Sequence, residues 1–496
     1  MRKEQKMKIL LAGYNVDYNL LRELKEKSAF GQDITPETIS AAYARISRSP
    51  KSVDALRQDA RAEVEKARKS NRNIVFEMGH SSVAEHAVFN IDVIGVSRLL
   101  VEEIEKFRLC SYTEKSQRYV LFDKDFVVPE EIVETGLTDL FVSTIAMQND
   151  FYHQLYEQLR PYVFERNKAL AENPANKSML EGWAKEDARY AIALATETQL
   201  GMTINARNLE LMLRRLAAVG LAEARLYSEK LYAATKDIAP SLIRYTQATD
   251  YERLTRRNLR EFCEVYAEKK ESRSRNVVRL VWSMPDADTQ AAAALLFASS
   301  GLSYDHCFNQ ARRMSLRDAK ALFKTVFENI QAYDAVLREF ENVEMQFELI
   351  MSASCFAQLK RHRMATIVSQ DYDPSLGVTM PPAVRAIGRQ KEFMAMIRKT
   401  NSVHELIRQK NPGAAAYVLT NAHRKRVLMK LNARELYHLA RLRADQHAQW
   451  DIRDLSEKML RQARKAMPLT LMMACGKDGF AVLQKKNFPR TSSLFI

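Results

Sequence analysis

The stretch KFRLCSYTEKSQR, residues 106–118, has a diverged second copy later in the chain that opens with RHR at residues 361–363. Each copy follows a segment in which apolar and polar residues alternate, FNIDV at 89–93 and VEMQFEL at 343–349. Such alternation is typical of a strand with one buried face. Helix-like segments, 97–108 and 354–363, then lead into the basic motifs. The order strand, helix, basic loop occurs twice, which predicts two copies of one unit.

A further pair of matching segments lies downstream, where ARY at 188–190 and TINAR at 203–207 match AAY at 415–417 and KLNAR at 430–434. Both Asn-Ala-Arg triplets open amphipathic segments, and Asn is a favoured helix N-cap. The first copy is longer between the basic motif and this triplet, with 97 positions from Arg108 to Asn205 against 69 from Arg363 to Asn432, so its extra residues are expected in the helical stretch 137–181. A repeat of this length indicates two fused domains. We expect domains at 1–250 and 270–496, a linker at 251–269, and the charged segment 268–275 at the junction.

The chain has 496 residues, of which 46% are hydrophobic and 28% charged. This length predicts roughly two to four domains. The charged N-terminus does not favour a secretory signal, and no apolar run approaches the about 20 residues that span a bilayer. The five cysteines are scattered, and His80 and His86 lack a nearby set of metal ligands. We expect a globular protein of the reducing cytoplasm, with no metal site and no membrane partner.

The net charge of +15 and the pI near 9.4 favour anionic partners. Nucleic acids, anionic cofactors and acidic membranes all meet that description. Basic clusters such as 423–426 are also what solvated helix faces show. Because basic and aromatic residues are not interleaved as on a single-strand platform, the sequence does not favour nucleic acid as the partner.

Both copies resemble the flavin-dependent thymidylate synthase family, whose signature reads Arg-His-Arg-x-x-Ser-x-Asn-Glu-x-Ser-x-Arg. The first copy also has GHSSVAEH at 79–86, which resembles the family's upstream box. It keeps the signature at Arg108, Ser111, Glu114, Ser116 and Arg118, and departs from it at Lys106, Phe107 and Thr113. The second copy matches fully at 361–363 and again in the C-terminal box at 432–450. Between these boxes it has Asp371 and Asp373 in place of Ser and Arg, whereas the first copy has Leu216 where Arg443 stands.

In this family one site is assembled from several subunits of a homotetramer, so the losses in the two copies are complementary. The resemblance gives the second copy dUMP contacts at Gln358 and Arg361, the pyrimidine contact at Arg443, and flavin contacts at Arg361, His362, Arg363, Asn432, Arg434, His438 and His447. It gives the first copy dUMP contacts at Glu114, Ser116, Gln117, Arg118 and Arg189, and flavin contacts at His80, Ser82 and Glu114. Ala416 replaces Arg189, and Asp373 replaces Arg118. One composite site is expected to work, and its mirror image to be dead.

The chemistry of these residue types agrees with that division. Arginine binds phosphate through planar bidentate contacts, whereas Asp371 and Asp373 would repel it. A guanidinium at Arg443 would favour ionisation of the pyrimidine N3, by a shift of roughly 1–3 pKa units, which makes C5 nucleophilic without a protein thiol. Hydride chemistry would belong to the flavin.

The resemblance therefore implies an enzyme that converts dUMP to dTMP with FAD as cofactor and with methylenetetrahydrofolate and NADPH as co-substrates. The expected fold is α+β (α/β layered), two tandem copies of a mixed sheet flanked by helices. Two such pseudo-dimeric chains would form a homodimer. The alternatives are a catalytically inactive scaffold that binds nucleotide or flavin, because Thr113 and His438 depart from the family, and a nucleic-acid-binding protein.

Overall fold

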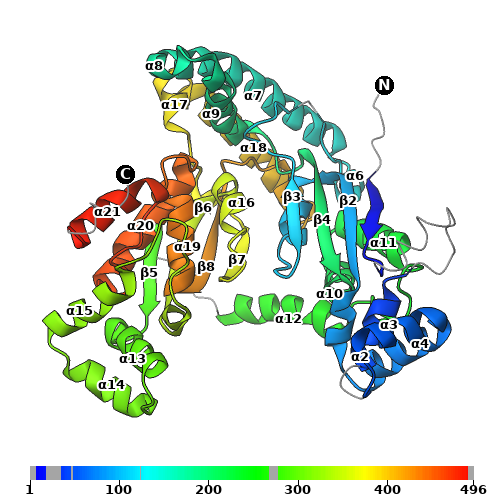
Figure 1. Cartoon of the computed structure of the whole chain (residues 1–496). Helices are drawn as coiled ribbons and strands as arrows, with labels where there is room; N and C mark the ends of the chain where they lie inside the picture. The colour runs from blue at the N-terminus through cyan, green and yellow to red at the C-terminus, as the bar shows by residue number, and fades with distance from the viewer. Residues whose placement is uncertain (1–6, 18–34, 46–48, 123–124, 267–276, 490–496) are drawn as a thin grey trace. The chain divides into compact units, whose positions relative to one another are not determined.

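The computed structural model describes residues 7–17, 35–45, 49–122, 125–266 and 277–489. These residues form two compact units, each with a four-stranded antiparallel sheet and helices around it (Figure 1). Unit 1 holds residues 1–271 with 386–419, and unit 2 holds 272–385 with 420–496. The α+β class and the two tandem copies are confirmed, although the strand pairs in both sheets are antiparallel where a mixed sheet was expected.

Unit 1 has the sheet order β1-β2-β4-β3. Its elements are β1 (Lys8–Tyr14), α2 (Glu37–Arg45), α3 (Val53–Ala62), α4 (Val64–Arg72), η2 (Asn73–Glu77), η3 (Ser81–His86), β2 (Val88–Ser97), α5 (Arg98–Ile104), β3 (Ser111–Glu114), α6 (Glu130–Glu134), α7 (Thr138–Arg166), α8 (Lys168–Ala171), η4 (Pro174–Asn176), α9 (Lys177–Ala188), η5 (Arg189–Ala191), β4 (Glu197–Asn205), α10 (Ala206–Ala217), α11 (Ala222–Thr235), α12 (Asp250–Tyr266), α18 (Gln390–Lys410) and η8 (Ala415–Val418).

Unit 2 repeats this sheet in the order β5-β6-β8-β7. Its elements are β5 (Val278–Ser283), α13 (Ala287–Ser299), α14 (Tyr304–Arg313), α15 (Leu316–Phe327), η6 (Arg338–Asn342), β6 (Glu344–Ser352), α16 (Ala353–Leu359), β7 (Thr366–Tyr372), η7 (Pro374–Leu376), α17 (Pro382–Ala386), β8 (Arg424–Asn432), α19 (Ala433–Arg443), α20 (Trp450–Ala466), η9 (Lys477–Gly479) and α21 (Phe480–Asn487).

The two sheets have matching registers. Val88 of β2 faces Asn205 of β4, as Glu344 of β6 faces Asn432 of β8. Ser111 of β3 faces Thr203, as Thr366 of β7 faces Lys430. The alignment of the copies therefore holds residue by residue along these strands. One difference is a bulge in β2 at Gly95, whose φ of 76° suits glycine, whereas β6 pairs with β8 without a break.

Side-chain caps begin the helices that follow the strands. Asn205 accepts the backbone N–H of Asn208 at 2.9 Å, and Asn432 accepts that of Glu435 at 2.8 Å, as predicted for both triplets. Ser97 and Ser352 cap α5 and α16 in the same way. Helices α5 and α16 end at Ile104 and Leu359, so the prediction that they reach the basic motifs at 108 and 363 was wrong by about one turn.

Residues 386–419 follow the second copy in sequence but pack in unit 1, where α18 lies beside α7 (Figure 1). Backbone N–H groups of Leu194 and Ala195 donate to the carbonyls of Leu419 (2.7 Å) and Tyr417 (2.9 Å). Tyr417 is fully buried in the core of unit 1. The compact units therefore differ from the predicted domains by this segment. The predicted linker contains the exposed helix α12, and its residues 267–269, like the junction segment 268–275, lie outside the described residues.

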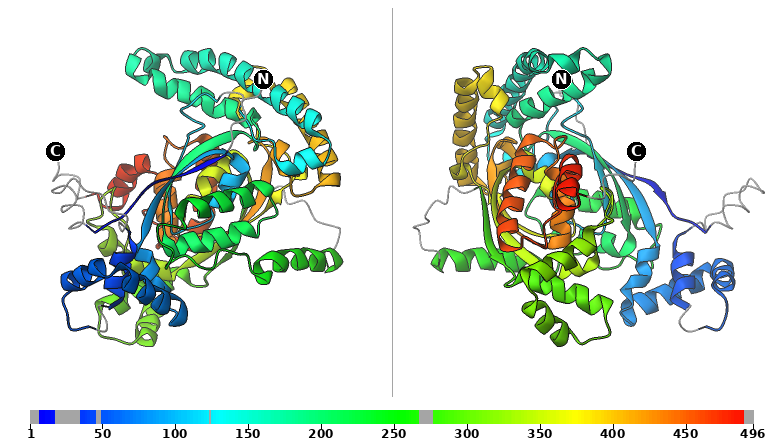
Figure 2. Two further views of the ribbon diagram at one scale, coloured as in Figure 1. Left: turned by 90° about the vertical axis from the view of Figure 1, so that its right-hand side faces the viewer. Right: turned by 60° about the vertical axis from the view of Figure 1, so that its left-hand side comes forward.

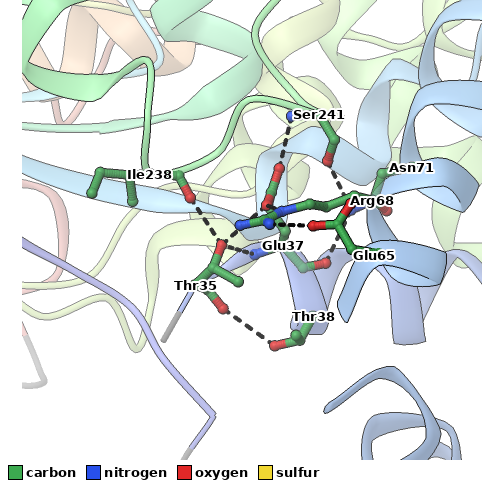
Figure 3. A network of polar contacts seen from close by, with 8 residues as sticks. All are labelled: Thr35, Glu37, Thr38, Glu65, Arg68, Asn71, Ile238 and Ser241. Atoms are coloured by element: carbon green, nitrogen blue, oxygen red, sulfur yellow. Dashed lines mark hydrogen bonds and ion pairs between the residues drawn. The ribbon is translucent and has the colours of Figure 1, made fainter. Parts of the chain in front are cut away.

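Helices α2, α3 and α4 of unit 1 pack on one another as a small bundle (Figure 2). A buried polar network ties this bundle to the segment after α11 (Figure 3). The Glu37 carboxylate accepts Arg68 Nε at 2.7 Å and the backbone N–H of Ser241 at 2.7 Å, and Thr35 Oγ1 donates to the Ile238 carbonyl at 2.8 Å. The carboxylate is fully buried, and its bonds to Arg68 and Ser241 join α2 and α4 to the segment after α11.

Candidate active site

In unit 2 a hydrogen-bonded chain joins the Arg-His-Arg motif to α19. The Nδ1 atom of His362 lies 3.1 Å from Oε1 of Glu435, and Arg443 Nε donates to Nε2 of the same imidazole at 3.2 Å. Arg443 Nη2 also donates to the Gln358 carbonyl at 3.3 Å. His362 is 2% exposed and Glu435 is 6% exposed. The chain Glu435, His362, Arg443 thus runs from the core to a half-buried guanidinium.

The protonation of His362 follows from its partners. A guanidinium only donates, so Nε2 must accept and the hydrogen stands on Nδ1, where it is donated to Glu435. Burial lowers the pKa of His362 below 6.5, and the charges of Arg443 and His438 lower it further, while the Glu435 carboxylate raises it in part. The imidazole is therefore neutral at neutral pH.

Gln358 on α16 is held from the other side by α20. Its Nε2 donates to Oε1 of Gln449 at 3.3 Å, and the same Oε1 caps α20 by accepting the N–H groups of Asp451 and Ile452. Ser352 donates to the Asp451 carboxylate at 2.5 Å. The residue whose backbone carbonyl receives Arg443 is thus held by its own helix α16 and by α20.

Of the remaining predicted residues of unit 2, His438 lies beside this chain. Arg361 is half-buried, whereas Arg363, His438 and His447 are exposed. The His438 ring meets the His362 ring edge-on at 5.7 Å between centroids. Asn432 is the N-cap of α19, which accounts for its conformation. Arg434 donates to Glu341 at 2.8 Å and to the Val336 carbonyl at 2.9 Å, so this arginine is tied to the protein.

In unit 1 the predicted residues gather into an arginine cluster around two acids. Glu114 at the end of β3 accepts Nη1 of Arg98 at 2.5 Å, and Glu186 of α9 accepts Nε of Arg118 at 2.9 Å. Ser116 and Arg118 share one turn, because Ser116 Oγ accepts the backbone N–H of Arg118 at 3.1 Å. Gln117 between them is buried.

Burial and charge act in opposite directions on this arginine cluster. Burial alone would lower the pKa of Arg98, but the carboxylates of Glu114, Glu102 and Glu105 raise it above its ordinary value. Arg189 is also buried, and its pKa is lowered by burial and by the charges of Arg118 and Arg98, with Glu186 acting the other way. Arg98 and Arg118 are each paired with a carboxylate, so the lowered pKa of Arg189 is the feature that an anion placed beside it would offset.

His80 and Ser82 are exposed residues at the start of η3, the first on the loop that leads into it and the second in its first turn. His80 stands at the N-cap position of η3, and its side chain makes no capping hydrogen bond. Gly79, with a φ of 74°, turns the chain into the loop. Among the described residues, no group of three His, Cys, Asp or Glu side chains could hold a metal ion. None of the described helices is long and apolar enough to cross a membrane.

Sequence reasoning missed three polar residues, Arg98, Glu186 and Glu435. Arg98 is a buried charge at the start of an apolar helix, which is a signal visible in the sequence. Glu435 lies three residues after the cap Asn432, where an acid is common for capping alone. Glu186 carried no signal, because its partner Arg118 is 68 residues away.

The sequence alignment of the two copies, with which the strand registers agree at the paired positions, assigns each polar residue a counterpart in the other copy. The chain of Glu435, His362 and Arg443 corresponds to Asn208, Phe107 and Leu216 in unit 1. The cluster residues Arg98, Glu114, Arg118 and Arg189 correspond to Ala353, Ser369, Asp373 and Ala416 in the second copy. Each copy thus holds one of the two polar clusters and lacks the other, which defines the chain as a fused pair of diverged units of one fold.

The family model described as thymidylate synthase complementing protein (Thy1) matches residues 32–241 and 279–469. These segments cover more than half of the chain, one in each copy, and the chain therefore belongs to this family as a tandem fusion.

Two kinds of relative agree with the fusion. The chain is 24% identical over 430 residues to a UPF0159 protein of Chlamydia muridarum, with 83% of this chain and 81% of that protein covered. A UPF0159 protein of Thermoplasma acidophilum is also 24% identical, with 80% and 86% covered. The flavin-dependent thymidylate synthase of Clostridium tetani is 31% identical over 216 residues, which are 42% of this chain and 82% of that enzyme. Most of a single-length synthase thus matches less than half of this chain.

Proposed function

We propose that this protein is a flavin-dependent thymidylate synthase that converts dUMP to dTMP, with methylenetetrahydrofolate as carbon donor, NADPH as reductant and FAD as cofactor. We further propose that its working site takes one side from each copy. The observation that carries both proposals is the complementary loss. Among the described residues, the Glu435, His362, Arg443 chain exists only in unit 2, and the paired arginines of the Glu114 and Glu186 cluster only in unit 1.

Unit 1 would bind the phosphate of the nucleotide. Arg118 presents a guanidinium held by Glu186, and Ser116 is fixed on the same turn. Burial and the neighbouring arginines lower the pKa of Arg189. An anion placed beside Arg189 would therefore stabilise its charged form more than that of the other two arginines. At the corresponding turn of unit 2, Asp373 uses its carboxylate to accept the N–H and hydroxyl of Ser375. That turn carries negative charge and would not bind the phosphate.

Unit 2 would bind the pyrimidine. A guanidinium fixed in one plane by His362 and the Gln358 carbonyl suits a planar ring with neighbouring acceptors. Beside the ring, Arg443 would stabilise the N3 anion and so raise electron density at C5. The side chain would act by position and charge, with no covalent bond to the protein.

The residues present fit a flavin dinucleotide. Arg363, His438 and His447 are exposed, and the His438 ring lies 5.7 Å from the His362 ring, so these side chains would offer cationic and imidazole groups on one face to an anionic dinucleotide with a heteroaromatic ring. Arg361, His362, Asn432 and Arg434 would support this face, while His80, Ser82 and Glu114 would contribute from the first copy. When bound, FAD supplies the hydride chemistry.

The test is dTMP formation by the purified full chain given dUMP, methylenetetrahydrofolate, FAD and NADPH. Arg443→Leu introduces the residue that the first copy has at this position, and we expect product formation to fall by about 100-fold to 1000-fold. Arg215→Leu, an exposed arginine on the equivalent helix α10, is the matched control and should keep full activity. An Arg443→Leu variant as active as the control would contradict the proposed role.

The alternative is an inactive nucleotide- or flavin-binding scaffold, favoured by the departures at Thr113 and His438. It predicts that the protein binds dUMP and FAD, measured by calorimetry and flavin absorbance, yet forms no dTMP with any reductant supplied. Binding without turnover would replace the synthase proposal with the scaffold.

The proposed homodimer raises the question of whether one chain or two supply the working site. Mixing an Arg118→Ala chain with an Arg443→Ala chain separates these cases, provided that the subunits exchange. Recovered activity would mean that sites are shared between chains, whereas no recovery after verified exchange would mean sites within one chain.

A further inference from the structure

We infer that Glu435 and His362 are positioning residues that hold the guanidinium of Arg443 in the plane required for the pyrimidine. This inference rests on the proposed function, because it deepens the role given there to Arg443. It concerns Glu435 above all, which is outside the residues indicated by the resemblance.

Two polar side chains are buried inside unit 2. The Glu435 carboxylate and the His362 imidazole are almost completely removed from solvent, at 6% and 2% exposure. Such groups destabilise a core unless each finds a partner. They find each other at 3.1 Å, and the second imidazole nitrogen finds Arg443 at 3.2 Å. The chain is therefore satisfied only when all three members are present.

The fold does not need this hydrogen-bonded chain of side chains. At the matching positions of unit 1, Phe107 and Leu216 are apolar, 8% and 1% exposed, and both lie in the core. Asn208, the counterpart of Glu435, turns its side-chain amide back to the cap Asn205 at 2.8 Å. The same helix and the same strand register form with an apolar pair in place of the polar chain. A purely structural role for Glu435 leaves this difference unexplained.

The hydrogen bonds of His362 with Arg443 and Glu435 have one fixed direction. Nε2 of His362 can accept from Arg443 only while the hydrogen stands on Nδ1, and the Glu435 carboxylate selects that tautomer because it can only accept. Arg443 Nε is then held by the imidazole and Nη2 by the Gln358 carbonyl. Because two donors of the planar Arg443 guanidinium are held, its plane is fixed before the nucleotide binds.

The experiment is a double-mutant cycle on dUMP affinity, measured by calorimetry with the full chain. Glu435→Leu removes the carboxylate and should weaken dUMP binding by about 10-fold to 100-fold, the effect of a misplaced binding group. Glu435→Gln keeps an acceptor for Nδ1 and should restore most of the affinity. In an Arg443→Leu background, Glu435→Leu should have no further effect, because its action passes through Arg443.

Two controls separate this inference from structural damage. In an Arg118→Ala background, Glu435→Leu should keep its full effect, because Arg118 belongs to the other half-site. Asn208→Leu, at the matching position of unit 1, should leave dUMP affinity unchanged. The triple variant His362→Phe, Glu435→Asn, Arg443→Leu carries the set found in unit 1, so it should fold and give the far-ultraviolet circular dichroism of the wild type.

The outcomes distinguish the two proposals. If Arg443→Leu alone leaves dUMP affinity unchanged, the proposed function loses its pyrimidine contact, whatever Glu435 does. If Arg443→Leu weakens binding but Glu435→Leu weakens it equally in both backgrounds, the positioning inference is overturned while the proposed function stands. Loss of the Glu435→Leu effect in the Arg443→Leu background, together with rescue by Glu435→Gln, supports the inference.

Discussion

The two copies keep the same framework and differ in the polar residues that their helices and turns present. Both use a serine that caps a helix and contacts an acid on a later helix, Ser97 with Glu223 at 2.6 Å and Ser352 with Asp451 at 2.5 Å. These shared serines belong to helix capping, which the fold needs in both copies. The differences lie where a helix or turn presents a side chain to the candidate site.

The comparison also explains how each copy can lose a half-site without unfolding. Unit 1 fills the positions of His362 and Arg443 with Phe107 and Leu216, which extend its apolar core. Unit 2 replaces Arg118 with Asp373, which stabilises its own turn by accepting from Ser375. Each loss is therefore accommodated locally. A fused chain that needs one working site from two halves permits such divergence, whereas identical subunits must retain every residue.

The largest effect is expected from moving Arg443 into the other copy. Leu216→Arg would place an unpaired charge in the core of unit 1, where Leu216 is 1% exposed, and should destabilise that unit by about 3–5 kcal/mol. The reverse change, Arg443→Leu, removes the donor to the buried Nε2 of His362 and should cost unit 2 about 1–3 kcal/mol. Urea unfolding followed by hydrogen exchange in each unit measures both. If both changes lower stability by the same amount, the apolar core of unit 1 is not what distinguishes the two copies.

Much of the framework could be predicted from the sequence. Alternation at 89–93 and 343–349 identified β2 and β6, and the Asn-Ala-Arg triplets identified the starts of α10 and α19, because period and capping are local properties. The stretch 137–181, predicted to be helical, forms α7, α8 and the start of α9. The roles of the individual site residues stay predictions.

What the sequence did not reveal depends on tertiary contacts. Glu435 and Glu186 were missed because their partners are 73 and 68 residues away. The packing of 386–419 in unit 1 was also missed, since an amphipathic helix carries an apolar face but no indication of which core it joins. Arg434 was assigned to the flavin, whereas its contact with Glu341 is a second function that its sequence position alone does not show.

The segment 386–419 offers a test of intermediate size. Buried Gln148 on α7 donates to Thr400 Oγ1 at 2.8 Å and to the Val418 carbonyl at 2.9 Å. Gln148→Leu would leave that carbonyl buried without this donor and should cost about 1–3 kcal/mol. Hydrogen exchange of residues 390–418 should rise, while Gln158→Leu, an exposed site on the same helix, should leave it unchanged. Unchanged exchange in both variants would mean that Gln148 does not hold the segment.

A smaller effect is expected in how the stability of unit 2 depends on pH. Because burial lowers the pKa of His362 below 6.5, the folded state binds the proton less tightly than the unfolded state does. Stability is therefore complete above pH 6.5 and falls as the pH drops toward the lowered pKa, by at most about 1.4 kcal/mol per pH unit. His362→Phe, which introduces the residue found at Phe107 in unit 1, should lack this slope. The groups that face the imidazole are Glu435, Arg443 and His438, so their variants are the controls.

Unfolding free energies of the wild type and of His362→Phe, measured in steps from about pH 7.5 to about pH 5, on either side of the ordinary histidine pKa, provide the comparison. The difference between them should shift in favour of the variant as the pH falls. A difference that stays constant over this range would mean that His362 is not the titrating group.

The smallest effect on stability concerns the ion pair that both copies retain. Arg207 donates to Glu85 in unit 1 as Arg434 donates to Glu341 in unit 2, and all four side chains are at least a quarter exposed. Arg207→Ala and Arg434→Ala should each cost less than about 1 kcal/mol, because exposed pairs contribute little. Flavin retention, measured by absorbance after gel filtration, should separate them. If Arg434 also grips the flavin, only Arg434→Ala loses it, whereas equal retention would leave Arg434 with the same structural role as Arg207.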